Sequence, residues 1–94
     1  MKIDFNKPLV NYKGEEVRDP RTGTVIMIKN VVCSTLSNTT AGTKDEKLEL
    51  DLIAAKIWMS GKETDITPEE SVLIRRHIEP LPATTFAQIY RLLG

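Results

Sequence analysis

The chain has little of what most catalytic and extracellular proteins depend on. Its 94 residues include one cysteine, one histidine and one tryptophan. A single cysteine, Cys33, excludes an internal disulfide and is typical of a reducing compartment. Thirteen basic residues balance thirteen acidic ones, so no net charge attracts the chain to nucleic acid or to an anionic membrane.

Segments that would direct the chain out of the cytoplasm are also lacking. Residues 1–10 contain no apolar stretch of the kind found in signal peptides. The apolar run at 25–28 is far shorter than the roughly 20 residues that a membrane-spanning helix needs. We therefore expect a cytoplasmic protein with no membrane partner.

The most informative stretch is residues 44–60, which we predict to be the central helix. At 100° per residue it carries two apolar stripes on opposite sides. One stripe is Leu48, Leu52, Ala55 and Met59, and the other is Leu50, Ile53 and Ile57. A surface helix normally has one such stripe, so we expect this helix to be packed on both sides.

Two further helices follow from clear end signals. Thr67, Pro68 and Glu70 form a capping box with proline at the first helical position, which predicts a helix over 67–79. Prolines at 80 and 82 end it, and Thr84 or Thr85 then begins a last helix over 84–93.

Residues 24–38 allow two interpretations. Apolar residues at 25, 28, 32 and 36 follow helical spacing and favour a helix capped by Thr24. The β-branched run at 25–28 could equally be a buried strand. We favour the helix, because the apolar spacing persists for three turns.

Residues 1–23 contain turn signals and alternating apolar residues, which predict a small hairpin. Its first strand would hold Ile3 and Phe5, and Glu15–Arg18 would return beside it with Val17 facing inward. The chain is thus predicted to be a single mainly α (α+β) domain over 1–94, with three to four helices packed around a central one and a small N-terminal β-hairpin.

No residue pattern indicates catalysis, a cofactor or a metal. His77 lies beside two arginines and is expected on a solvated helix face, and Cys33 is expected to be a small core residue. One histidine and one cysteine supply no local pair of metal ligands, and the five glycines are isolated, so no phosphate loop is present. We expect a protein that is not an enzyme.

Apolar and aromatic residues on two helices are candidates for contact with a protein partner. Trp58 lies between the two stripes of the central helix, where it belongs either to the core or, with Met59, to a partner surface. Phe86 and Tyr90 share one face of the last helix. A helix with two apolar faces could also bury one of them against another copy of the chain.

The alternative is a DNA-binding regulator. Residues 67–93 have the outline of a helix-turn-helix, in which Thr84, Thr85, Gln88 and Arg91 would reach the major groove and Arg75 and Arg76 would contact phosphates. The zero net charge and the rigid, glycine-free connection at 79–82 favour a plain helical hairpin instead.

The layout of the chain resembles small proteins encoded in bacteriophages and prophages. The resemblance rests on the segments LDLIAAKIW, ITPEESVLIRRHIE and FAQIYRLL, with Ala54–Ile57 and the cap at Thr67–Glu70 as its strongest pieces. It implies an assembly factor, an accessory protein or an inhibitory adaptor that acts by protein contact in the host bacterial cytoplasm. It carries over no catalytic residue.

Overall fold

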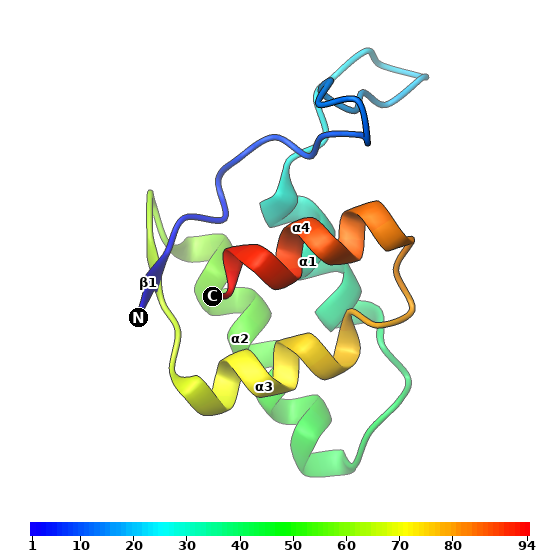
Figure 1. The fold of residues 1–94 in the computed structure, drawn as a ribbon. Coiled ribbons are helices and arrows are strands. Elements are labelled where there is room, and N and C mark those ends of the chain that lie inside the picture. The colour runs from blue at the N-terminus through cyan, green and yellow to red at the C-terminus, as the bar shows by residue number, and fades with distance from the viewer.

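The structure, a computed structural model, describes residues 1–94 as a mainly helical fold with a small β component. The predicted fold class is therefore confirmed. In chain order the elements are β1 (Lys2–Ile3), α1 (Ile28–Asn38), α2 (Lys44–Met59), β2 (Thr64–Asp65), α3 (Pro68–His77) and α4 (Ala83–Leu92) (Figure 1).

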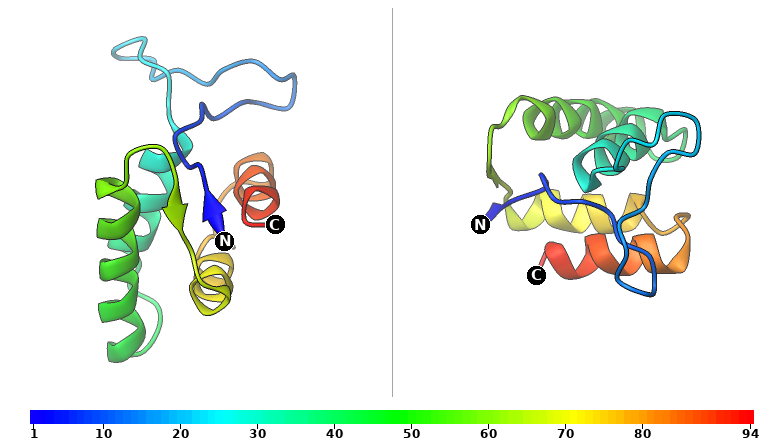
Figure 2. Two further views of the ribbon diagram at one scale, coloured as in Figure 1. Left: turned by 90° about the vertical axis from the view of Figure 1, so that its left-hand side faces the viewer. Right: turned by 90° about the horizontal axis from the view of Figure 1, so that it is seen from above.

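The helices form two layers. Figure 2 shows α1 and α2 side by side in one layer and α3 and α4 in the other, with the N-terminal segment passing between them. The contact between α1 and α2 is the most extensive between any two elements. Helix α2 therefore lies at the edge of the molecule, with α1 and α3 both on its inner side.

The predicted helix starts are correct where a side chain caps the first turn. Thr43 accepts a hydrogen bond from the backbone N–H of Glu46 at 3.2 Å, and α2 begins at the next residue. At α3 the full capping box between Thr67 and Glu70 is present, with Pro68 at the first position. Both helices end slightly before their predicted ends. Helix α2 ends at Met59 rather than at residue 60, and α3 ends at His77 rather than at residue 79.

The predicted start of the helix over 24–38 is wrong. The helix begins at Ile28, and the residues before it are extended, because Val25 pairs with Arg18 and Met27 pairs with Pro8. Residues 25–27 of this run are therefore extended, and the helix begins at Ile28. At α4 the cap is also different, since Pro82 rather than Thr84 or Thr85 precedes the helix.

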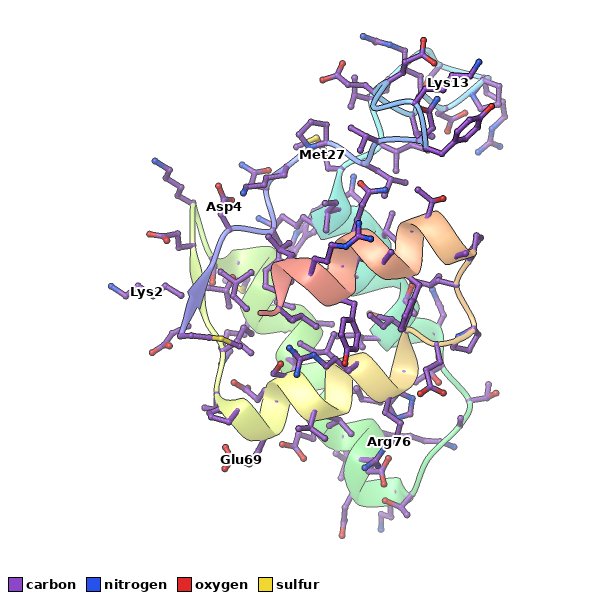
Figure 3. The ribbon with its side chains drawn as sticks, in the orientation of Figure 1. Lys2, Asp4, Lys13, Met27, Glu69 and Arg76 are labelled. Atoms are coloured by element: carbon purple, nitrogen blue, oxygen red, sulfur yellow. The ribbon has the colours of Figure 1, made fainter.

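The predicted pairing within residues 1–23 is also wrong. Ile3 in β1 pairs antiparallel with Thr64 in β2, 61 positions along the chain, instead of with a strand at 15–18. Val17 belongs to a closed ring of three backbone hydrogen bonds, in which Leu9 N donates to Ile26 O, Ile26 N to Val17 O and Val17 N to Leu9 O, at 2.8–2.9 Å. This ring holds the N-terminal turns, whose tip carries Lys13, away from the helices (Figure 3).

The core draws on every helix and on the N-terminal segment, but only on one side of α2. Leu50, Ile53, Ala54 and Ile57 of α2 are buried. The opposite stripe is exposed to solvent, and Leu52 keeps 69% of its surface. The prediction that α2 packs on both sides is therefore wrong for the single chain, because no other element reaches its outer side.

An ion pair fixes α2 against the start of α3. Lys56 Nζ donates to both carboxylate oxygens of Glu70, at 2.7 and 2.9 Å, and to the carbonyl of Asp65 at 2.7 Å. Partial burial acts to raise the pKa of the Glu70 carboxyl, but the hydrogen bonds from Lys56 and from the Thr67 backbone outweigh it and leave that pKa lowered.

The one-sided burial of α2 predicts opposite results for two leucines two positions apart. Replacing the fully buried Leu50 by alanine leaves a cavity and should lower the free energy of unfolding by about 2–5 kcal/mol. L52A should change it by no more than about 0.5 kcal/mol in dilute solution. Urea denaturation measures both, and equal losses would contradict the one-sided packing of α2.

The lowered pKa of Glu70 predicts a pH dependence of stability. Because the folded-state pKa lies below the unfolded one, the stabilisation is present above the unfolded pKa and is lost as the pH falls through the folded one. E70Q should therefore be less stable than wild type at about pH 7, with a smaller difference at about pH 3. Glu69, an exposed neighbour in the same turn, provides the control E69Q. A pH-independent difference between E70Q and wild type, measured by urea denaturation, would contradict this account.

Candidate interaction surface

The most unusual surface of the molecule is the exposed side of α2, which we call the outer face. It consists of Leu48, Leu52, Ala55 and Met59. Leu48, Leu52 and Met59 are 59%, 69% and 84% exposed. At 100° per residue the four positions lie within about 60° of one another, on the side opposite Leu50 and Ile57.

The outer face results from the spacing of apolar residues in one helix. Its members recur at intervals of four, three and four residues, which is the spacing of a coiled-coil seam. The 16 residues of α2 span about 24 Å, and the two layers of Figure 2 leave its outer side open over that length. An exposed apolar patch of this kind is often a site of interaction with another molecule.

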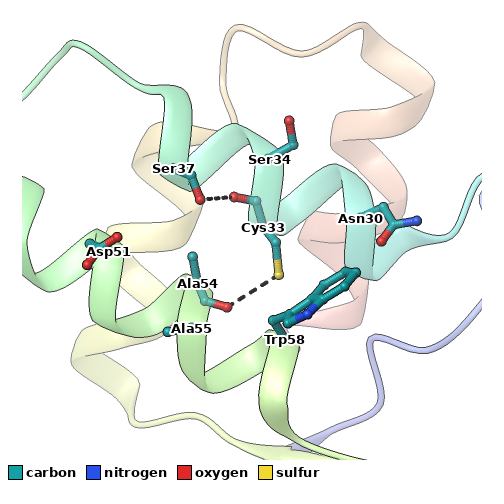
Figure 4. Close-up of a pocket in the computed structure, with 8 residues that line it drawn as sticks. All are labelled: Asn30, Cys33, Ser34, Ser37, Asp51, Ala54, Ala55 and Trp58. Atoms are coloured by element: carbon teal, nitrogen blue, oxygen red, sulfur yellow. Dashed lines mark hydrogen bonds between the residues drawn. The ribbon is translucent and has the colours of Figure 1, made fainter.

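An open groove of about 410 Å³ adjoins the outer face, between α1 and α2 (Figure 4). Its lining consists of Asn30, Cys33, Ser34, Ser37, Asp51, Ala54, Ala55 and Trp58. The Trp58 ring forms one wall, is 59% exposed and has the ammonium of Lys29 5.4 Å from its centre. Of the two predicted places for Trp58, the structure selects the surface, beside Met59, rather than the core.

Cys33 lies in this groove as a packing residue. Its thiol is 3.4 Å from the carbonyl oxygen of Ala54, which links α1 to α2 (Figure 4). Burial raises the pKa of the Cys33 thiol, and the positive charge of Lys29 offsets only part of that effect. The thiol is therefore protonated at neutral pH and a weak nucleophile.

The charges around the outer face differ between its two ends. Residues 44–51 carry four carboxylates (Asp45, Glu46, Glu49 and Asp51) against two lysines. The other end carries Lys62, Glu63 and Lys29, whose ammonium donates to the carbonyl of Ser60 at 3.0 Å, and the charge of Lys56 there is paired with Glu70. Only the end at 44–51 thus has a clear excess of one sign, which is negative.

The two predicted partner-binding residues of α4 lie elsewhere. Helix α4 is in the other layer, across the molecule from the outer face (Figure 2). Phe86 is half-buried against the core, and Tyr90, 46% exposed, packs on it with ring centres 5.4 Å apart. The structure therefore brings Trp58 together with Met59, but neither of them with Phe86 or Tyr90.

Two of the five residues predicted for nucleic-acid contact bind the backbone of other parts of the chain. Gln88 donates to the carbonyl of Val10 and accepts from its N–H at 3.0 Å. Arg75 donates to the carbonyl of Gly94, and its guanidinium lies 4.9 Å from the centre of the Tyr90 ring.

The other three predicted DNA contacts differ from one another. Arg76, on the side of α3 nearest α2, pairs with Glu46 at 3.3 Å (Figure 3). Thr85 is half-buried, and only Arg91 is both exposed and without an internal partner.

The prediction that His77 lies on a solvated helix face is wrong. The residue is 6% exposed, with Nε2 3.4 Å from a Glu46 oxygen and Nδ1 3.4 Å from the Thr39 hydroxyl. The connection before α2 passes over the His77 ring, and Gly42 adopts φ +100° there. No three histidine, cysteine, aspartate or glutamate side chains gather in a way that could hold a metal ion.

Comparison with known proteins identifies no relative. No family model, curated protein or solved structure matches the chain significantly. None of the helices combines the length and the apolar character needed to cross a membrane.

The two hydrogen bonds from Gln88 to Val10 predict a structural effect of the Q88A substitution. Its removal leaves a backbone N–H and a carbonyl without partners, which should cost about 1–3 kcal/mol of unfolding free energy. R91A, an exposed change on the same helix, should cost no more than about 0.5 kcal/mol. Urea denaturation distinguishes the two, and similar small effects for both would contradict the anchoring role of Gln88.

Proposed function

We propose that the protein is a non-enzymatic interaction module that binds a protein partner through the outer face of α2. The observation that carries this proposal is the exposure of Leu48, Leu52 and Met59 on one line of the helix, opposite its buried side. Removing such a stripe from water is favourable at about 25 cal/mol per Å² of apolar surface.

The chemistry of the outer face favours a helical partner. Apolar residues spaced four, three and four apart match the seam by which two amphipathic helices pack together. Trp58, an aromatic residue of the type enriched in interface cores, extends the apolar surface into the neighbouring groove. A partner helix with its own apolar stripe, flanked by charges, fits this surface best.

The placement of the chain's reactive side chains supports a non-enzymatic role. Cys33 is protonated and packs against Ala54, and His77 lies beneath a loop, in contact with Thr39 and Glu46. These two side chains have no hydrogen-bonding partner in common. General acid–base or nucleophilic chemistry would need such groups to converge on one site.

From the resemblance to phage and prophage proteins, we propose that the module is an assembly, accessory or inhibitory adaptor of the bacterial cytoplasm. Of the two kinds of partner considered, a protein is favoured over DNA. The internal contacts of Arg75, Arg76 and Gln88 leave Arg91 as the main free side chain of the proposed DNA-binding set.

The test compares a variant of the outer face with a matched variant elsewhere. L52K places a charge in the middle of the stripe, and V72K does the same at an exposed apolar position of α3, where the side chain is 55% exposed. Each tagged protein is used to capture partners from host cell extract. A captured protein is then purified, and its affinity for each variant is measured by calorimetry.

The proposal predicts that wild type and V72K bind the purified partner equally, and that L52K binds at least tenfold more weakly. Circular dichroism confirms that all three proteins are folded. Equal binding by L52K and wild type would show that the outer face is not the interaction surface.

A further inference from the structure

We propose that the partner of the outer face is the α2 helix of a second copy of this chain, packed antiparallel to the first. This inference rests on the proposed function, because it names the occupant of the same surface. In the pair, Leu48 lies opposite Met59 of the second copy, and Leu52 lies opposite Ala55 of the second copy. Three properties of α2 lead to this arrangement.

The first property is the symmetry of the apolar spacing. The intervals between Leu48, Leu52, Ala55 and Met59 are the same in both directions along the chain, four, three and four. Rotation by 180° about an axis between residues 53 and 54 therefore superposes the stripe on itself. A closed two-fold dimer needs such a self-complementary surface.

The second property is the difference in size between the two middle residues. In the antiparallel pair, the large Leu52 of each copy meets the small Ala55 of the other, so that both layers at the centre are filled to the same depth. In a parallel pair Leu52 would face Leu52 and Ala55 would face Ala55. One layer would then hold the helices apart while the next left a gap.

The third property is the distribution of charge. Residues 44–51 hold four carboxylates against two lysines, and reversing one helix places the two acidic ends at opposite ends of the pair. A parallel pair would instead set the two acidic ends side by side.

The surroundings of α2 leave room for this partner. In both views of Figure 2 the helix lies at the edge of the molecule, with no element outside it. The apolar surface of the outer face and Trp58 is a few hundred Å² per copy, so a pair buries on the order of 1,000 Å², near the lower limit of stable interfaces. We therefore expect a weak, reversible dimer.

Oligomeric state is the first measurement. Sedimentation equilibrium over a hundredfold range of concentration should show wild type and V72K passing from the 10.6 kDa monomer towards twice that mass. L52K, which brings a lysine against Ala55 of the second copy, should associate at least tenfold more weakly.

Cross-linking tests the direction of the helices. Cysteine replaces Lys44, Lys62 or Lys13 in a background in which Cys33 is serine. In the antiparallel pair residue 44 lies at the end of the second copy's α2 that leads into Lys62, whereas the two copies of residue 44 are about 28 Å apart along the axis. A short bismaleimide should therefore join K44C to K62C in a mixture. It should not join K44C to K44C or K62C to K62C. The distant K13C should form no cross-link with either variant.

Each contrary outcome has a distinct meaning. Cross-linking of K44C to itself, or a dimer unaffected by L52K, would overturn the antiparallel pairing. A monomer at every concentration would overturn self-association, and the proposed function would survive it if L52K still weakened binding to another purified protein. If L52K changed neither association nor binding to another protein, both proposals would fail.

Discussion

The burial of one side of α2 is the interaction on which the rest of the structure depends. Leu50, Ile53 and Ile57 fill the space between the two helix layers, and both α1 and α3 pack against that side. The ion pair between Lys56 and Glu70 fixes the same helix to the start of α3. A chain of 94 residues has one core of limited size, and this core covers only one side of its longest helix. The exposed outer face is the direct consequence.

Local signals in the sequence were sufficient to predict the helices, their order and the cap of α3. Thr67 and Glu70 satisfy each other's backbone groups within four residues, so the capping box needs no distant partner. The errors came where distant segments decide the conformation. Val25 and Met27 have helical spacing but are held extended by Arg18 and Pro8, and Ile3 finds its partner at Thr64. Pairings between distant segments cannot be recognised from the spacing of apolar residues within one segment.

The candidate site was predictable in part for the same reason. Both apolar stripes of α2 could be recognised from spacing, but spacing cannot say which stripe faces the core, because Leu50 and Leu52 are the same residue type. Gln88 and His77 show a second limit. Each looked like a polar surface residue, and each instead satisfies groups of another segment, Gln88 at Val10 and His77 at Thr39. Only the three-dimensional contacts distinguish a structural polar residue from a binding one.

The central claim is that the chain by itself leaves one side of α2 in water. The most direct test is NMR of leucine methyl groups in dilute solution with a soluble paramagnetic agent, which broadens the signals of solvent-exposed methyls. Our account predicts strong broadening for Leu48 and Leu52 and protection for Leu50, which is fully buried in the same helix. Equal protection of Leu50 and Leu52 in the monomer would mean that the outer face is covered by the chain itself, and would contradict the account.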